Sequence, residues 1–105
     1  MTSTDHKAMK LLYQNAIAVT AALINEWDPY SLISGGAPKD EFASEVSRIV
    51  AKAHEANTPE ALARVISGVF SASFEPEPFS IQACLPVATR LLEELKTSGY
   101  VESTP

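Results

Sequence analysis

The sequence predicts an all-α fold: one compact, bundle-like domain of four helices over residues 1–105, with an ordered core over about residues 5–98. Apolar residues recur at three- and four-residue spacing in four segments, as on one face of a helix. Segments with proline and glycine separate them, and no window shows the period-two alternation of a half-buried strand. At 105 residues, 46% hydrophobic and 20% charged, the chain has the composition of a single folded domain.

The first helix is expected from about Asp5 to Trp27, with Thr4 as its N-cap. Pro29 disfavours helical geometry in the residue before it, so the helix should end near Trp27. Thr20 fills the one gap in its apolar stripe, which comprises Met9, Leu12, Tyr13, Ala16, Ile17, Leu23, Ile24 and Trp27.

Residues 28–38 form a long connection, and their two prolines and Gly-Gly pair exclude regular structure. The apolar residues within this connection should fold it back on the core. A second helix is expected after Pro38 and should run to about Ala56, where Asn57 can adopt the left-handed conformation that ends a helix. Its first turn should contain Asp40 and Glu41.

The third helix has the clearest start signal, because Thr58-Pro59-Glu60 supplies a hydroxyl cap, a proline at the first position and then an acid. Gly68 inside this helix indicates a close helix crossing, since glycine there is otherwise unfavourable. Its apolar stripe comprises Leu62, Val65, Ile66, Val69 and Phe70.

The fourth helix follows a proline-rich connection, residues 71–80, and should end at Gly99. Pro86 lies within the helical pattern and lacks a backbone donor, so we expect a short turn over 80–84 and a kink or a true start at 85–86. The apolar stripe of this helix comprises Cys84, Val87, Ala88, Leu91, Leu92 and Leu95.

Charge excludes two classes of partner. Eight basic against thirteen acidic residues leave a net charge of −5, whereas nucleic acids and anionic membranes attract basic surfaces. The single cysteine, Cys84, cannot form an internal disulfide, and no signal sequence or membrane-spanning run is visible, so a cytoplasmic location is expected. Cys84 lies on an apolar stripe and is interpreted as a packed structural thiol.

No catalytic, cofactor-binding or metal-binding residue is predicted. The Glu-x-x-His pairs of di-metal bundles are missing, and Gly35-Gly36 lacks the context of a phosphate loop. His54 is expected at the surface, near the end of the second helix. Glu41 and Glu45 are four residues apart and would share one helical face, which supports an alternative hypothesis: a small hydrolase that uses a divalent cation.

The favoured hypothesis is a small non-enzymatic binding protein with a basic protein partner, such as an immunity-type inhibitor. Acids cluster around the long connection, and we expect them to share one end of the molecule. A basic partner would be selected by electrostatic complementarity. The candidate contact residues are Glu26, Asp28, Tyr30, Asp40, Glu41 and Glu45.

Two further features bear on binding. Trp27 is either a core residue that closes the first stripe or an interface anchor, and the sequence leaves both open. Residues 74–78, Phe-Glu-Pro-Glu-Pro, are the only other place where acids and an aromatic ring are held together by rigid backbone. The sequence does not establish the oligomeric state.

Several segments resemble those of a known family. The chain contains Leu-Ile-Asn-Glu-Trp-Asp-Pro at 23–29, Gly-Ala-Pro-Lys-Asp-Glu-Phe-Ala-Ser-Glu at 36–45 and Thr-Pro-Glu-Ala-Leu-Ala at 58–63, followed by the apolar pattern around Cys84. In this order they resemble the YugE-like family of small helical bacterial domains of unknown function, over roughly residues 10–96. The resemblance implies an all-helical single domain and brings no reaction, cofactor or site residue.

Overall fold

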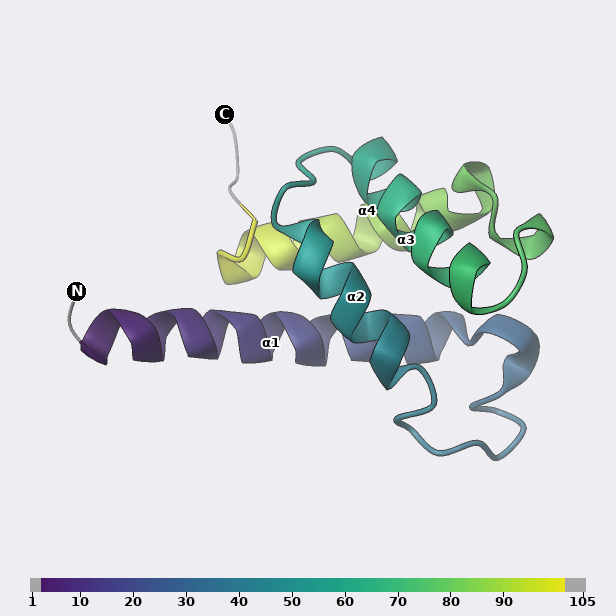
Figure 1. Ribbon diagram of the computed structural model, residues 1–105, viewed down its shortest axis with the longest axis horizontal. Coiled ribbons are helices and arrows are strands. Elements are labelled where there is room, and N and C mark those ends of the chain that lie inside the picture. The colour runs from purple at the N-terminus through teal and green to yellow at the C-terminus, as the bar shows by residue number, and fades with distance from the viewer. Residues whose placement is uncertain (1–2, 102–105) are drawn as a thin grey trace.

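The computed structural model describes residues 3–101, with side chains from Lys7 onward, and this part of the chain is all-α, as predicted. Figure 1 shows the long first helix along the molecule, with the other three packed against one side of its C-terminal part. Two short 3₁₀ helices, η1 and η2, lie in the connections. The elements are α1 Ser3–Trp27, η1 Pro29–Ser31, α2 Ala43–Ala53, α3 Pro59–Ser73, η2 Glu77–Phe79 and α4 Ile81–Ser98.

The predicted caps of α3 and the end of α4 are confirmed. The Ala61 amide donates to Thr58 Oγ1 at 3.1 Å, and Pro59 occupies the first turn. At the C-terminal end of α4, Gly99 adopts a φ of 85° and ends the helix in the left-handed conformation. Local residue choice therefore determines where these helices begin and end.

The prediction for the start of α4 was wrong, because the helix is continuous from Ile81 and contains Pro86. The Ala83 amide donates to the Ser80 side chain at 3.1 Å, which makes Ser80 the N-cap. Pro86 therefore lies in the second turn, where it removes only one intrahelical hydrogen bond. The buried stripe on both sides of the proline compensates for that loss.

Three other predicted boundaries also need correction. α2 begins at Ala43 rather than after Pro38, because successive tight turns occupy residues 38–43: the Glu41 amide donates to Pro38 O and the Ala43 amide to Asp40 O. It ends at Ala53 in similar tight turns, and Asn57 is not among the left-handed residues. At the start of α1, Thr4 lies inside the helix, whose first described residue is Ser3.

The core lies between α3, α4 and the C-terminal part of α1, and α2 covers its remaining side. Its largest fully buried side chains are Phe42, Phe70, Ile24, Ile49, Leu62, Ile66, Leu91 and Leu95. Gly68 does not mark a close helix crossing, because it faces solvent and an added Cβ would meet no atom within 4 Å.

The connection between α1 and α2 folds back on the core, as expected from its apolar residues. Pro29 is buried, and Leu32 and Ile33 pack against the core. Residues 29–31 also form the 3₁₀ turn η1, which the two prolines did not exclude. This connection reaches the α3–α4 connection and forms one end of the molecule with it.

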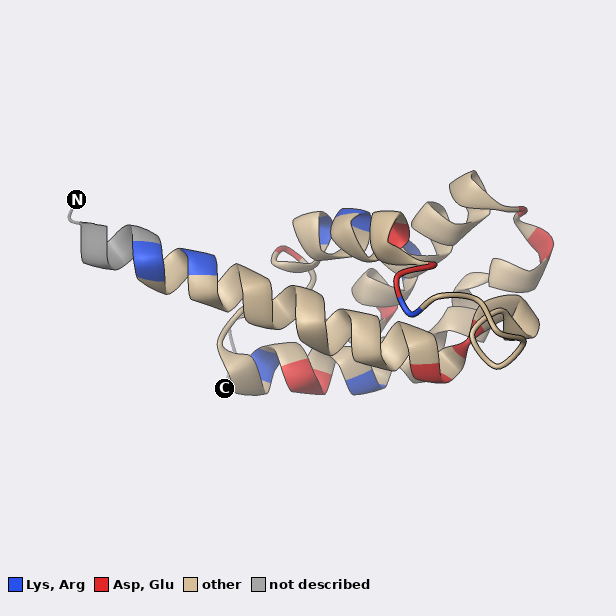
Figure 2. Ribbon diagram, turned by 90° about the horizontal axis from the view of Figure 1, so that it is seen from below, with Lys and Arg blue, Asp and Glu red and all other residues tan. Residues whose placement is uncertain are grey.

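The N-terminal part of α1 projects beyond the other helices (Figures 1 and 2). All described side chains from residue 7 to residue 15 are exposed, whereas Ala16, Thr20 and Ile24 farther along the same helix are fully buried. No helix within residues 3–101 is long and apolar enough to cross a membrane.

Candidate binding surface

Six aromatic side chains gather where the α1–α2 connection meets the α3–α4 connection. Phe70 lies at the centre, with its ring centroid 5.5 Å from that of Trp27 and 5.1 Å from that of Phe79. Phe42, Phe70 and Phe79 are buried, whereas Tyr30 and Phe74 are 47% and 41% exposed. The cluster therefore joins the core to an exposed aromatic pair.

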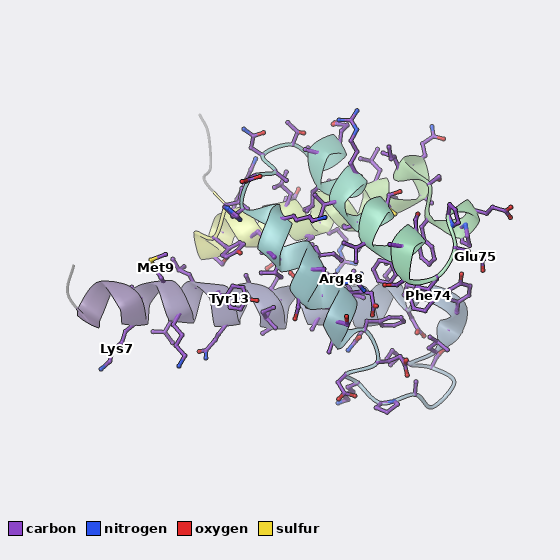
Figure 3. All side chains as sticks on the ribbon, viewed as in Figure 1. Lys7, Met9, Tyr13, Arg48, Phe74 and Glu75 are labelled. Carbon is purple, nitrogen blue, oxygen red and sulfur yellow. The ribbon has the colours of Figure 1, made fainter. Side chains whose placement is uncertain are left out.

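We call the exposed part of this cluster, made of Tyr30, Phe74, Glu75 and Glu77, the Tyr30–Phe74 surface. The Tyr30 and Phe74 ring centroids are 5.5 Å apart, and Tyr30 Oη donates to Glu75 Oε2 at 2.8 Å. Desolvation, together with the hydrogen bond and the negative charge of Glu75, raises the pKa of Tyr30. Figure 3 shows Phe74 and Glu75 at the end of the molecule remote from Lys7, where Figure 2 also shows acidic residues.

The backbone that presents Tyr30 is held in an unfavourable conformation. Asp28, Tyr30 and Ser31 have φ values of 51°, 60° and 54°, a region that residues with a Cβ rarely adopt. Such residues persist only where the surrounding structure enforces them, and they cluster at ligand-binding sites.

The carboxylate of Asp28 is the group that enforces this loop. It accepts hydrogen bonds from the amides of Ile33, at 2.7 Å, and Ser34, at 3.0 Å. Partial burial acts to raise the pKa of Asp28, but the hydrogen bonds from Ser34 and Ile33 outweigh it and hold the pKa below its ordinary value. Among the predicted contact residues, Asp28 thus organises the loop through its carboxylate.

Two more of the predicted contact acids are engaged by arginines. Glu26 receives two hydrogen bonds from Arg90, at 3.0 and 3.3 Å, and the Arg90 guanidinium lowers the pKa of Glu26. Glu45 is buried, with its Oε2 3.0 Å from the Arg48 guanidinium and 2.8 Å from the Ser73 hydroxyl, which donates to it. Both carboxylates are therefore already neutralised within the chain.

Asp40 and Glu41 are exposed in the turns before α2, next to Lys39. The Asn25 side chain donates to the Lys39 carbonyl at 2.9 Å and ties these turns to α1. The two acids thus lie on the same connection as Tyr30, but ten residues or more after it, in the turns that lead into α2. Of the six predicted contact residues, Tyr30 is the one that the fold combines with exposed aromatic and acidic neighbours.

The paired carboxylates of the hydrolase hypothesis do not share a helical face. Glu41 precedes α2 and is exposed, whereas Glu45 lies inside the helix and pairs with Arg48. Among the side chains that the structure describes, no three His, Cys, Asp or Glu residues gather closely enough to hold a metal ion.

The thiol and the imidazole considered from the sequence lie where they were expected. Cys84 is fully buried, and burial raises the pKa of its thiol to about 11. His54 is exposed at the C-terminal end of α2, with Nε2 3.9 Å from a Glu55 carboxylate oxygen. Neither has the surroundings of an activated catalytic group.

Sequence reasoning noted the rigid Phe-Glu-Pro-Glu-Pro segment but did not connect it with Tyr30. Tyr30 and Glu75 are 45 residues apart in the chain, and only the packing of both connections on Phe79 brings them together. A tyrosine next to a proline turn and a phenylalanine next to acidic residues were the available signals.

Comparison with known proteins gives one match. The family model described as a domain of unknown function (DUF1871) matches residues 19–101, which covers the C-terminal part of α1 and all of α2, α3 and α4. No curated protein and no solved structure matches the chain. Because the match spans most of the sequence, the chain belongs to the DUF1871 family of domains of unknown function.

Proposed function

We propose that this chain is a non-enzymatic binding protein that recognises a basic segment of a protein partner at the Tyr30–Phe74 surface. The observation that carries the proposal is the exposed aromatic pair beside an exposed carboxylate, with Tyr30 bonded to Glu75. Aromatic side chains that are half exposed and held rigidly are typical of the residues that dominate binding energy in interfaces.

The chemistry of this surface suits an arginine or a lysine. A guanidinium stacks on an aromatic face through a cation–π interaction, and a carboxylate at the ring edge can accept its hydrogen bonds. Glu77 is exposed two residues beyond Glu75 and adds a second negative charge. A basic segment with two cationic side chains would therefore find both rings and both acids.

Pre-organisation of the surface supports its role in binding. The Asp28 carboxylate holds the loop of Tyr30, and the ring of Phe74 stacks on the buried Phe70 at a centroid distance of 5.9 Å. Little conformational entropy is then lost when a partner docks. The net charge of −5 would also accelerate the approach of a basic protein.

A peptide titration tests the proposal. An arginine–glycine peptide, added to the isotope-labelled full chain, should shift the NMR signals of Tyr30, Phe74 and Glu75 in a saturable and salt-sensitive way, whereas a glutamate–glycine peptide should not. Phe74→Ala or Glu75→Gln should each weaken binding about two- to fivefold, as expected for one lost cation–π or ion-pair contact.

Glu93→Gln is the matched control, because it removes one exposed charge from α4 and leaves the Tyr30–Phe74 surface intact. Equal weakening by Glu75→Gln and Glu93→Gln would show that only net charge matters and would refute the proposed surface. Shifts centred on Asp40 and Glu41 would instead assign the basic partner to the turns before α2.

A further inference from the structure

The projecting part of α1, residues 7–15, here called the arm, continues an apolar stripe that the rest of the protein covers only in part. Met9, Leu12 and Tyr13 follow the spacing of Ala16 and Thr20, so they lie on the face that buries those residues farther along. Yet Met9 is 64%, Leu12 38% and Tyr13 42% exposed. The stripe is suited to burial, but α2 and α4 end beside its base and α1 continues beyond them (Figure 1).

The same three side chains form one wall of a groove of about 360 Å³, whose opposite wall is His54 and Tyr100. Figure 3 shows Met9 on the side of α1 toward the other helices and Lys7 on the opposite side. The Tyr100 hydroxyl donates to Val50 O at 2.8 Å, which keeps the far wall in place. An apolar groove therefore opens at the base of the arm.

The arm lies outside the part of the chain that matches the family, which begins at residue 19. It also differs from that part in charge. Lys7 and Lys10 are the only lysines, arginines or acids between residues 6 and 25, whereas residues 19–101 contain six basic and eleven acidic residues. The chain thus joins a basic, apolar helix to an acidic domain.

We propose that the arm is a self-association site, in which the arms of two copies pack antiparallel and each covers the stripe and the groove of the other. A twofold axis brings the same stripe to both sides of the contact, so one apolar face meets another. The antiparallel direction sets the basic end of each arm against the acidic domain of the second copy. Glu55, whose side chain is 82% exposed, lies beside His54 at the rim of the groove and is available to Lys7 or Lys10 of that copy.

The size of the contact explains why the groove has to take part. A standard interface covers roughly 800 Å² on each partner, which is more than one face of a short helix offers. A helix of the arm's length is also marginal in water without tertiary contacts. Both facts favour a second helix that lies on the stripe and reaches into the groove.

Sedimentation velocity of the full chain, from low micromolar to millimolar concentration, tests this directly. We expect a reversible dimer, and we expect Met9→Glu to raise its dissociation constant at least tenfold. Leu11→Glu is the matched control: Leu11 is 65% exposed, like Met9, but lies two residues away, on the opposite face of the helix. It should leave the dimer intact, and circular dichroism should show an unchanged fold for both variants.

Charge reversal tests the direction of the arms. Lys7→Glu/Lys10→Glu should weaken an antiparallel dimer and should leave unchanged a parallel one, in which like charges face each other in either case. A monomer at every concentration, or equal effects of Met9→Glu and Leu11→Glu, would overturn the self-association site. Binding of the monomer to phosphatidylglycerol vesicles through Met9 would overturn it too and would assign the stripe to a lipid surface.

Discussion

At the scale of single residues, burial decides which carboxylates are available to a partner. Glu41 and Glu45 are four positions apart and have the same side chain, but one is exposed and the other is held by Arg48 and Ser73. The sequence alone could not separate them, because the network around Glu45 includes a serine 28 residues away.

Charge reversal at these two positions should therefore have very different effects on stability. Glu45→Lys should lower the free energy of unfolding by about 2–3 kcal/mol, because it places a cation beside Arg48 in a buried site. Glu41→Lys should change it by about 0.5 kcal/mol or less, as exposed substitutions do. Urea unfolding measures both, and equal effects would contradict a stabilising role for the buried Glu45 carboxylate.

Gly68 and Gly99 form a second contrasting pair. Gly68→Ala should stabilise the protein by about 0.5–1 kcal/mol, because alanine favours the helix and its Cβ meets no neighbour within 4 Å. Gly99→Ala should destabilise it by about 1 kcal/mol, because Gly99 has a φ of 85°. Thermal melts should move in opposite directions, and a loss of stability in Gly68→Ala would restore a packing role for that glycine.

The Cys84 thiol should be unreactive toward thiol reagents in the folded protein. Burial raises the pKa of its thiol to about 11, so almost no thiolate exists at pH 8, and the sulfur is inaccessible. A thiol-reactive dye should therefore label it only as fast as the protein unfolds, and at once in guanidinium chloride. Rapid labelling of the native protein would show that the α4 stripe opens.

At the scale of elements, capping groups decide where chain segments begin and how they bend. Ser80 starts α4 early enough to place Pro86 in its second turn, and the Asp28 carboxylate imposes three left-handed residues on the loop that follows α1. In both segments a side chain bonded to backbone amides outweighs an unfavourable local preference.

The Asp28 loop should make stability depend on acid. The folded-state pKa of Asp28 lies below its ordinary value of 3.8, so the ionised carboxylate contributes stability above about that pH, and the contribution disappears as the pH falls through the lowered value. Asp28→Asn should melt at a lower temperature than the parent at pH 7, and the gap should narrow toward pH 2. An identical gap at both pH values would show that the charge of Asp28 is not what holds the loop.

At the scale of the whole molecule, one aromatic cluster links the three parts of the chain that meet at the end with the Tyr30–Phe74 surface. Trp27 lies at its edge, partly buried, with edge-on contacts to Phe70 at 5.5 Å and Phe79 at 5.9 Å. It also lines a shallow groove of about 150 Å³ with Pro86 and Arg90. Trp27 is therefore a core residue with one edge at the surface.

Truncation of this side chain should weaken the entire fold. Trp27→Ala should cost about 3 kcal/mol, at the lower end for aromatic residues because part of the ring is already in contact with water. Trp27→Phe should recover a share of that loss by keeping one ring against Phe70. Denaturant unfolding distinguishes these variants. A Trp27→Ala protein as stable as the parent would leave Trp27 without a role in the core.

The sequence by itself determined the helical class, the apolar stripes that form the core and two of the caps, because these depend on residues within a few positions of one another. The Thr-Pro-Glu start of α3 and the glycine that ends α4 are of this kind. Tertiary structure alone decided which acids pair with arginines and that Tyr30 donates a hydrogen bond to Glu75. It also decided that the apolar stripe of α1 extends beyond the helices packed on it. Those outcomes depend on contacts between residues far apart in the chain and on the relative lengths of packed helices, which no local pattern records.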